Sequence, residues 1–266
     1  MLKAPSTGPV NSIDLTRVVV VLVATRNSLN IGAAARAMSN FGFGGLRLVR
    51  PWDPSFQEAK EAERSAVGAG DLLASARIFP TVAEAVADCT LVLGTTAVTA
   101  GGRRDLQHPL DTLGESAERI REHLSGQGTR TAILFGSEKT GLSNDDLSHC
   151  HRLLRIPTRE QHISMNLGQA VAICLYELIR TESGASPAHA EAAQPAAATS
   201  EEVERLTQMV LEALQNTGYI APGAEAATEE KLRRHFRRFA LTRQDAQLAL
   251  GMARQILWKL RPPDSL

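Results

Sequence analysis

Short apolar runs alternate with amphipathic or Ala-rich stretches through the first two thirds of the chain. Residues 17–24 form a nearly continuous β-branched run, which is typical of a strand buried on both faces. Shorter apolar runs predict further strands at residues 45–49, 77–79, 90–94, 131–135 and 153–156. Helical patterns lie between them, at residues 30–42, 58–67, 81–87, 109–124, 145–150 and 164–181. The alternation predicts an α/β fold, a parallel sheet flanked by helices.

The polar and Gly-rich loops of this region follow predicted strands. In parallel sheets ligands bind beyond the carboxyl ends of the strands, so these loops are expected to share one edge. The longest of them covers residues 95–108 and contains glycines and arginines.

A change of composition separates this region from the rest of the chain. Residues 182–200 are Ala, Pro, Ser and Glu with almost no large apolar side chain, which indicates a flexible linker. Three helices are predicted after it, at residues 201–217, 228–240 and 242–260. We therefore expect a flexible tail (1–16), a sheet domain (17–182), a linker (183–200) and a small all-α C-terminal domain (201–266).

Composition limits the partners. The formal net charge of the 266 residues is +0, so nucleic-acid binding would require a local basic face. The three cysteines, Cys89, Cys150 and Cys174, form no CxxC pair, which argues against a disulfide framework and fits a reducing cytoplasm. No apolar run approaches transmembrane length, and the N-terminus lacks the apolar core of a signal peptide, so we expect no membrane partner.

The common nucleotide-binding and metal-binding patterns are absent. No GxGxxG follows the first strand and no GxxxxGK[ST] occurs, which disfavours an NAD enzyme or a P-loop NTPase. The run His149-Cys150-His151 is a poor metal site, because adjacent helical side chains point in different directions. We predict no metal.

Three other stretches can carry chemistry. Asn30 can cap a helix that contains Arg36, and Gly32 allows another group to approach that helix closely. Glu138 lies between two glycines that permit tight turns, whose N–H groups can face a ligand. Taken singly, the stretches fit ordinary caps and a solvated arginine.

The third stretch opens the last helix of the sheet domain. Ser164 and Asn166 can cap its free N–H groups or hold a ligand there. Similarly, Ser143 with Asp146 has the spacing of a capping box.

In this order and spacing, the stretches NIGAAAR (30–36), LFGSEKTGLS (134–143) and ISMNLGQAV (163–171) resemble the three motifs of the SpoU-type 2′-O-ribose methyltransferases of the SPOUT superfamily. The resemblance covers residues 17–180. The linker and the helical tail with KLRRHFRR (231–238) resemble the TrmJ-type branch, which methylates nucleotide 32 in the anticodon loop of tRNA.

The resemblance implies a deep trefoil knot formed by the last strand, loop and helix, an obligate homodimer, and S-adenosyl-L-methionine as methyl donor. No metal is required. The donor site that it implies lies in the knot loops and comprises Thr95, Thr96, Ala97, Gly136, Ser137, Gly141, Ile156, Met165 and Leu167.

The implied reaction is an in-line displacement that mainly needs positioning of donor and acceptor. The ribose 2′-hydroxyl is a weak nucleophile and needs help to lose its proton. Arg36 matches the family's motif arginine, for which base and phosphate anchor are both open; we favour an electrostatic clamp, because arginine almost never deprotonates. Residues that would position it and the hydroxyl are Asn30, Glu138, Ser164 and Asn166.

Two groups of arginines are candidates for RNA binding. Residues 231–243 contain six Lys or Arg and no acid, and helical spacing places Arg233, Arg234, Arg237 and Arg238 on one face that can contact phosphates. In the loop after residue 94, Arg103 or Arg104 corresponds to an arginine of the TrmJ-type branch, the register being open. With only 4% aromatic residues, recognition of RNA shape and backbone is favoured over base stacking.

Two alternatives stay open. One is a SPOUT enzyme acting on ribosomal RNA, against which the C-terminal position of the appendage counts. The other is a non-catalytic RNA-binding protein of the same fold, against which the intact motif residues count. Binding of the methyl donor would discriminate, because a scaffold has no need of it.

Overall fold

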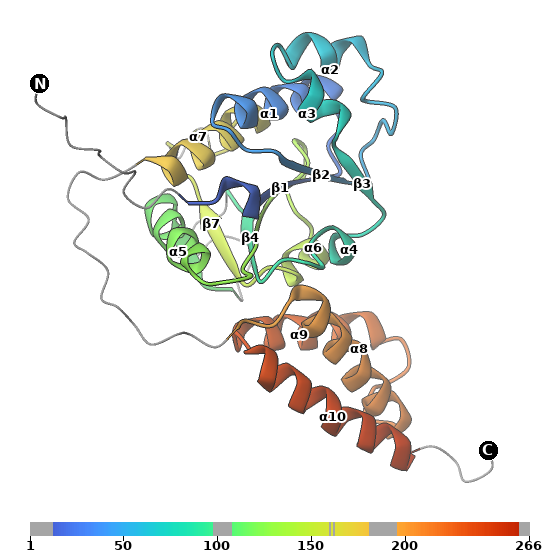
Figure 1. The fold of residues 1–266 in the computed structure, drawn as a ribbon. Coiled ribbons are helices and arrows are strands. Elements are labelled where there is room, and N and C mark those ends of the chain that lie inside the picture. Colours follow the sequence, from blue (N-terminus) through green and yellow to red (C-terminus); the bar gives the residue numbers. More distant parts are fainter. Residues whose placement is uncertain (1–12, 98–107, 160, 162, 181–195, 261–266) are drawn as a thin grey trace, which may run out of the picture.

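The computed structural model describes residues 13–97, 108–159, 161, 163–180 and 196–260. Its centre is a seven-stranded parallel sheet with the order β3-β2-β1-β6-β4-β7-β5 (Figure 1). The strands are β1 (Val18–Val23), β2 (Gly45–Val49), β3 (Arg77–Phe79), β4 (Leu91–Thr95), β5 (Leu110–Thr112), β6 (Thr131–Phe135) and β7 (Arg152–Arg155). The predicted α/β fold is confirmed.

Helices cover both faces of this sheet. A short 3₁₀ helix, Leu15–Arg17, precedes β1. The α-helices of this region are α1 (Ser28–Asn40), α2 (Lys60–Ser65), α3 (Gly70–Ala74), α4 (Val82–Ala85), α5 (Leu113–Ser125), α6 (Asn144–Ser148) and α7 (Leu167–Ile179). Helices α1, α2, α3, α5 and α7 pack on one face, and α4 and α6 pack on the other.

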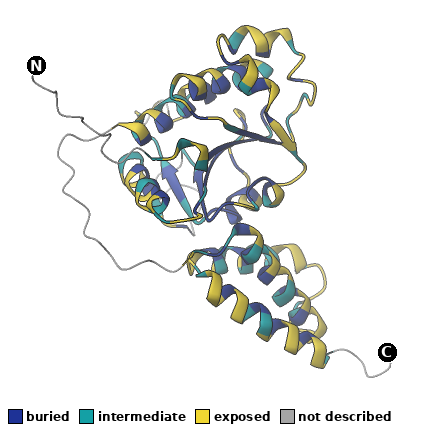
Figure 2. Ribbon diagram, viewed as in Figure 1, coloured by how far each residue is buried: buried dark blue, intermediate teal, exposed yellow. Residues whose placement is uncertain are grey.

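The alternation of side chains along β1 explains the two layers. Val18, Val20 and Leu22 belong to the core beneath α1 and α7, whereas Val19 and Val21 belong to the core beneath α4 and α6. Every residue of β1 is buried (Figure 2). A central parallel strand is covered on both faces, which is why its sequence is apolar throughout.

A helical region follows and lies against the amino ends of several strands. It comprises α8 (Ser200–Asn216), α9 (Glu225–Arg238) and α10 (Arg243–Leu260). Its small core includes Val203, Leu206 and Leu250. The amide of Ser200 donates a hydrogen bond to the carbonyl of Cys89 at 2.7 Å, which attaches the start of α8 to the chain segment before β4.

Several local expectations are wrong. Residues 110–112 form the edge strand β5 instead of the start of a helix, since a three-residue strand is too short to show an apolar period. Helix α1 is capped by Asn27, whose side chain accepts from the amide of Leu29, so Asn30 lies in its first turn. The short helix α3, which begins at Gly70, lies in a segment where no helix is predicted.

Two structural observations bear on location and redox state. No helix in the described part of the chain is long and apolar enough to cross a membrane. The three cysteines are buried and free, and burial raises the pKa of each thiol to about 12.

Candidate active site

Four segments meet at the carboxyl edge of the sheet. The strands β1, β6, β4 and β7 are neighbours in that order, so the segments that follow them emerge side by side. These segments are the start of α1, the loop 136–143, residues 96–97, and residues 156–159 with 163–166. The arrangement brings together stretches that are more than 100 residues apart in the chain.

A chain of side-chain hydrogen bonds joins the three motifs. Asn30 Nδ2 donates to Glu138 Oε1 at 2.6 Å, and Asn166 Nδ2 donates to Asn30 Oδ1 at 3.1 Å. Asn166 Oδ1 in turn accepts from the backbone N–H groups of Gly168 and Gln169. Asn166 therefore caps α7 and also holds Asn30, a double role that a simple cap would not require.

Glu138 is the acidic end of this chain. Its second carboxylate oxygen accepts from the amide of Arg26 at 3.1 Å. Partial burial alone would raise the pKa of Glu138, but the hydrogen bonds from Asn30 and from the Arg26 amide hold it below its usual value. Glu138 is therefore an anion at neutral pH, and Asn30 must present its amide nitrogen to it.

No sequence pattern indicates the Arg26 and Trp52 pair beside this site. The Arg26 guanidinium lies 4.7 Å from the centre of the Trp52 ring, and that ring is 72% exposed. The amide of Trp52 donates to the carbonyl of Thr25, which ties the loop after β2 to the loop after β1. Only the approach of these two loops in space reveals the pair.

The glycine loop after β6 is sterically fixed. A Cβ on Gly136 would lie 2.2 Å from the carbonyl carbon of Gly141, and Gly141 has a φ of +68°. The amide of Gly141 donates to the carbonyl of Ser137 at 2.8 Å, which closes the loop. Only glycine fits at position 136, and the left-handed backbone favours glycine at 141.

Helix α1 is approached closely by two other helices. A Cβ on Gly32 would lie 2.2 Å from the carbonyl oxygen of Ala62, so the group that approaches Gly32 is α2. A Cβ on Gly168 would lie 2.7 Å from the Cβ of Ala33, so α7 approaches the next residue. The small residues of the first motif therefore serve helix packing, in addition to any ligand.

The remaining residues expected at the donor site lie at the same edge. Thr95 ends β4 and donates its hydroxyl to the carbonyl of Leu134 at 2.9 Å. Ser137 and Leu167 are buried. The residues that are partly or fully accessible at the loop ends are Thr96, Ala97, Ile156, Ser164 and Met165. Ser164 is exposed, and no hydrogen bond of its side chain occurs within the described ranges.

Arg36 lies apart from the hydrogen-bonded chain. It is exposed on α1, six residues after Asn30, which turns its side chain well away from that of Asn30 around the helix. No hydrogen bond or ion pair joins Arg36 to another of the residues that the structure describes. The structure therefore brings together Asn30, Glu138 and Asn166, but does not bring Arg36 to them within one chain.

The prediction that four arginines of α9 form one face able to contact phosphates is wrong for two of them. Arg233 and Arg237 are only 4% and 2% exposed, and they face the sheet region instead of solvent. Arg233 donates to Glu204, Glu229, Asp145 and Ser148. Helical spacing cannot show that carboxylates from α6 and α8 surround this position.

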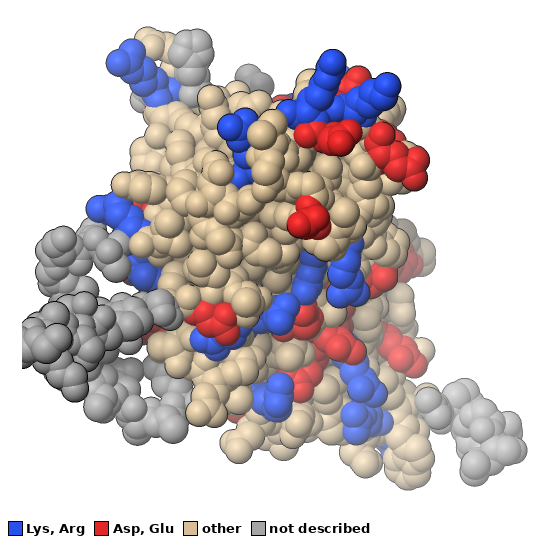
Figure 3. All heavy atoms as spheres, turned by 45° about the horizontal axis from the view of Figure 1, so that its top comes forward, with Lys and Arg blue, Asp and Glu red and all other residues tan. Residues whose placement is uncertain are grey.

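The other candidate RNA contacts differ in their placement. Arg234 is half-buried and Arg238 is exposed. Arg103 and Arg104 lie outside the described residues. Lys and Arg are mostly accompanied by Asp or Glu on the face in Figure 3, in keeping with the neutral net charge.

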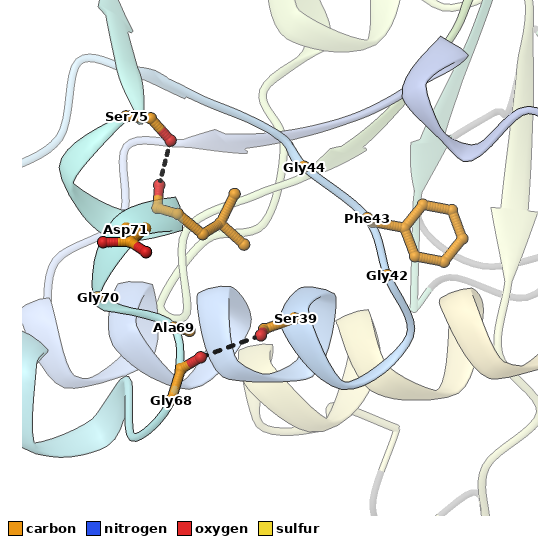
Figure 4. A pocket seen from close by; sticks show the side chains of 10 residues that line it. Ser39, Gly42, Phe43, Gly44, Gly68, Ala69, Gly70, Asp71 and Ser75 are labelled. Atoms are coloured by element: carbon orange, nitrogen blue, oxygen red, sulfur yellow. Dashed lines mark hydrogen bonds between the residues drawn. The ribbon is translucent and has the colours of Figure 1, made fainter.

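Among the described residues, no metal cluster is found at this site, and the hollow at the far end of α1 lies apart from it. The described residues contain no group of three or more His, Cys, Asp or Glu placed to hold a metal ion. A hollow of about 770 Å³ lies at the far end of α1, between Gly42–Gly44 and Gly68–Ser75 (Figure 4). None of the motif residues lines it.

The parallel α/β fold and its joined motif loops are those of a protein class that a family model identifies. The model of the SpoU rRNA Methylase family matches residues 17–176. The chain belongs to the SpoU methylase family and is a methyltransferase.

Similar proteins extend this match over the helical region. A tRNA (cytidine/uridine-2'-O-)-methyltransferase TrmJ of Klebsiella pneumoniae is 33% identical over 91% of this chain and 97% of its own. Its counterpart from Pectobacterium atrosepticum is 32% identical over 90% and 95%. The crystal structure of TrmJ from Z. mobilis is 32% identical with a TM-score of 0.76, covering 90% of this chain and 98% of that one.

Proposed function

We propose that this protein transfers a methyl group from S-adenosyl-L-methionine to the 2′-oxygen of a ribose in tRNA, at nucleotide 32 of the anticodon loop. The observation that carries the proposal is the hydrogen-bonded chain Asn166–Asn30–Glu138, which joins all three motifs at one edge of the sheet. The relatives named as tRNA (cytidine/uridine-2'-O-)-methyltransferases support tRNA as substrate, because they match nearly the whole chain.

The residues at the carboxyl edge fit the donor. The turn at Gly136 and Gly141 leaves no room for a side chain at 136, so backbone groups form its surface. Apolar side chains of Ile156 and Leu167 stand at the neighbouring loop, which suits an adenine or a thioether. When bound, the donor supplies an electrophilic methyl group on a sulfonium.

The residues of the chain then have separate tasks. Glu138 is ionised and fixes the amide of Asn30, which fixes Asn166 at the start of α7. Arg36 supplies a cation that stabilises the charge developing on the 2′-oxygen as its proton leaves. Thr95, Thr96, Ala97, Ser137, Ser164 and Met165 complete the donor and acceptor surfaces.

A homodimer, with the knot that the family resemblance implies, belongs to this proposal. Helices α1 and α7 carry exposed apolar side chains, with Leu29 at 42%, Tyr176 at 53% and Ile179 at 36% exposure. Ile163, before α7, is 50% exposed. A second copy on this face would cover them and would lie against α1, where Arg36 is exposed.

Ribosomal RNA is the second candidate substrate. The description of the matching family model as an rRNA methylase favours it. The match of TrmJ relatives across the helical region favours tRNA instead.

The test is transfer of labelled methyl from S-adenosyl-L-methionine to unmodified tRNA and to ribosomal RNA, followed by nuclease mapping. Label on the 2′-oxygen of nucleotide 32 is expected. Arg36→Ala should reduce the rate about 100-fold or more, the usual cost of removing one oxyanion-stabilising group. Arg254→Ala is the control, because Arg254 is exposed on α10 in the helical region.

Three results would contradict parts of the proposal. Label on ribosomal RNA alone would show that ribosomal RNA, and not tRNA, is the substrate. Full activity of Arg36→Ala would remove Arg36 from the mechanism. Absence of both transfer and donor binding would leave a non-catalytic RNA-binding protein.

A further inference from the structure

A second polar pocket lies at the opposite edge of the sheet. It has a volume of about 290 Å³ and is lined by the amino ends of β4 and β7, by Pro109 before β5, by α5 and by the end of α9. The candidate active site lies at the carboxyl ends of the same strands. A five-residue strand spans about 16 Å, so the two sites are separate.

Arg237 is the most deeply buried arginine among the residues that line this pocket. It is 2% exposed and donates from one terminal nitrogen to Ser200 Oγ at 2.6 Å and from the other to the Ser200 carbonyl at 3.2 Å. Its Nε has no hydrogen-bond partner, and no carboxylate of the described residues lies within ion-pair distance of it. A buried cation without an ion-pair partner is costly, and burial lowers the pKa of Arg237 to about 10 despite the opposing charge of Glu204.

Arg233 shows what a compensated arginine looks like in the same helix. One turn earlier on α9, it is equally buried but is paired with Glu204, Glu229 and Asp145. The fold therefore supplies carboxylates at one position and omits them at the next. The missing counter-charge at Arg237 coincides with an open pocket.

Further polar groups without partners occur near the end of α9, beside the lining. Arg234 Nε and His108 Nε2 also lack hydrogen-bond partners, although neither residue lines the pocket, and burial together with the charges of Arg234 and Arg238 lowers the pKa of His108 to about 4. His151 Nδ1 accepts from the amide of Val92 at 3.0 Å, so a neutral ring carries its proton on Nε2, as a donor. Arg238, exposed, completes this wall.

The acids near the pocket do not balance these groups. Arg152 and Arg119 both pair with Asp111, at 2.5 Å and 3.3 Å. Glu122 is the acid among the lining residues, and neither Arg237 nor Arg238 has an ion-pair partner in the described part of the chain. Donors and positive charge are therefore in excess here.

We propose that this pocket binds a phosphate group, from a free phosphate compound or from the backbone of RNA. Guanidinium groups match phosphate oxygens in geometry and charge, and the partly apolar walls, with Leu91, Phe236 and Leu241, strengthen such contacts. The phosphate would touch groups from the sheet and from α9 together. Its binding therefore fastens the helical region to the sheet.

The test uses thermal unfolding of the full-length protein, which does not depend on methyl transfer. Inorganic phosphate and pyrophosphate are titrated against chloride at matched ionic strength. A ligand at about 100 times its Kd raises Tm by several degrees, and that rise is expected for the wild type. Arg237→Met, which keeps the volume of the side chain, should abolish the rise, and the matched control Arg254→Met should retain it.

A second variant covers failure of Arg237→Met to fold. Arg238→Gln changes an exposed residue of the same wall and should weaken the apparent affinity for phosphate about tenfold or more. No rise of Tm in the wild type, or an equal rise in the wild type, Arg237→Met and Arg238→Gln, would overturn the proposal.

The salt dependence of tRNA binding distinguishes the two sources of phosphate. If an RNA phosphate occupies the pocket, Arg237→Met should reduce the slope of log K against log salt by about one. An unchanged slope, together with the lost Tm response, assigns the pocket to a free phosphate compound.

Discussion

At the carboxyl edge of the sheet, the Glu138 carboxylate is held by the amide of Asn30 and by the backbone of Arg26. At the amino edge, by contrast, the Arg237 guanidinium is buried with only Ser200 as partner. The first edge has a complete hydrogen-bond chain that needs no further partner to be fixed. The second leaves donors without acceptors. The fold alone therefore pre-organises the carboxyl edge, whereas the donors of the amino edge need a bound anion to be satisfied.

The two buried arginines of α9 provide the largest expected effect. Arg233→Met should lower the free energy of unfolding by about 3–5 kcal/mol, because it leaves Glu204 and Glu229 without their cation. Arg237→Met should be neutral or stabilising without phosphate, because it removes a buried charge that has no ion-pair partner. Urea unfolding in phosphate-free buffer measures both. Equal losses in the two variants would contradict the contrast between them.

Substitution in the glycine loop after β6 should lower the stability nearly as much. Gly136→Ala should cost about 1–3 kcal/mol, because the new Cβ would meet the backbone of Gly141 and Leu142 at 2.2 Å. The same variant should weaken binding of S-adenosyl-L-methionine in a titration by calorimetry. Gly44→Ala is the control, since nothing lies within 4 Å of its added Cβ. Normal stability and donor affinity of Gly136→Ala would show that the loop is not fixed.

Because the histidines at the amino edge have lowered pKa values, we expect the stability to depend on pH. Burial lowers the pKa of His108 and of His123 to about 4, whereas unfolded histidines titrate near pH 6.5. Between about pH 6.5 and pH 4 the unfolded state binds protons that the folded state does not. The free energy of unfolding should therefore decrease as the pH is lowered through this window, by up to about 1.4 kcal/mol per pH unit for each histidine.

Urea unfolding between pH 7 and pH 5 measures this slope. His123→Gln should flatten it, because the glutamine does not titrate while its amide can still bond to Thr90. An unchanged slope in His123→Gln would mean that the pKa of His123 does not differ between the folded and unfolded states.

The smallest effect is expected at Glu138. Because its folded pKa is lowered, its contribution is present above the unfolded pKa and is lost as the pH falls through the folded pKa. Glu138→Gln should therefore unfold at a slightly lower urea concentration than the wild type at pH 7. The two midpoints should converge once the pH is below the folded pKa of Glu138, and a difference that persists there would rule out the carboxylate as its cause.

Some elements were predictable because local chemistry determines them. The β-branched run at 17–24 and the apolar run at 131–135 became the central strands β1 and β6. Ser143 and Asp146 form the reciprocal hydrogen bonds of a capping box at the start of α6. Such features depend on residues that are close in sequence, so their pattern is visible there.

The candidate site was predictable only as a set of motifs. The sequence placed Asn30, Glu138 and Asn166 in three loops at strand ends, but it assigned Asn30 to a cap that Asn27 makes instead. Both asparagines are good caps, and nothing local distinguishes them. The side chain of Asn30 instead bonds to Glu138 and Asn166, which are 108 and 136 residues away in the sequence.

The sequence by itself determined the α/β order of elements, the three motifs and the helical tail, because periodicity, caps and turns are short-range. Only the tertiary structure decided which arginines of α9 are buried, since two of the three carboxylates around Arg233 come from α6 and α8. It alone placed Arg237 in a pocket without a counter-charge. Charge compensation is a property of neighbours in space, and a helical repeat contains no information about them.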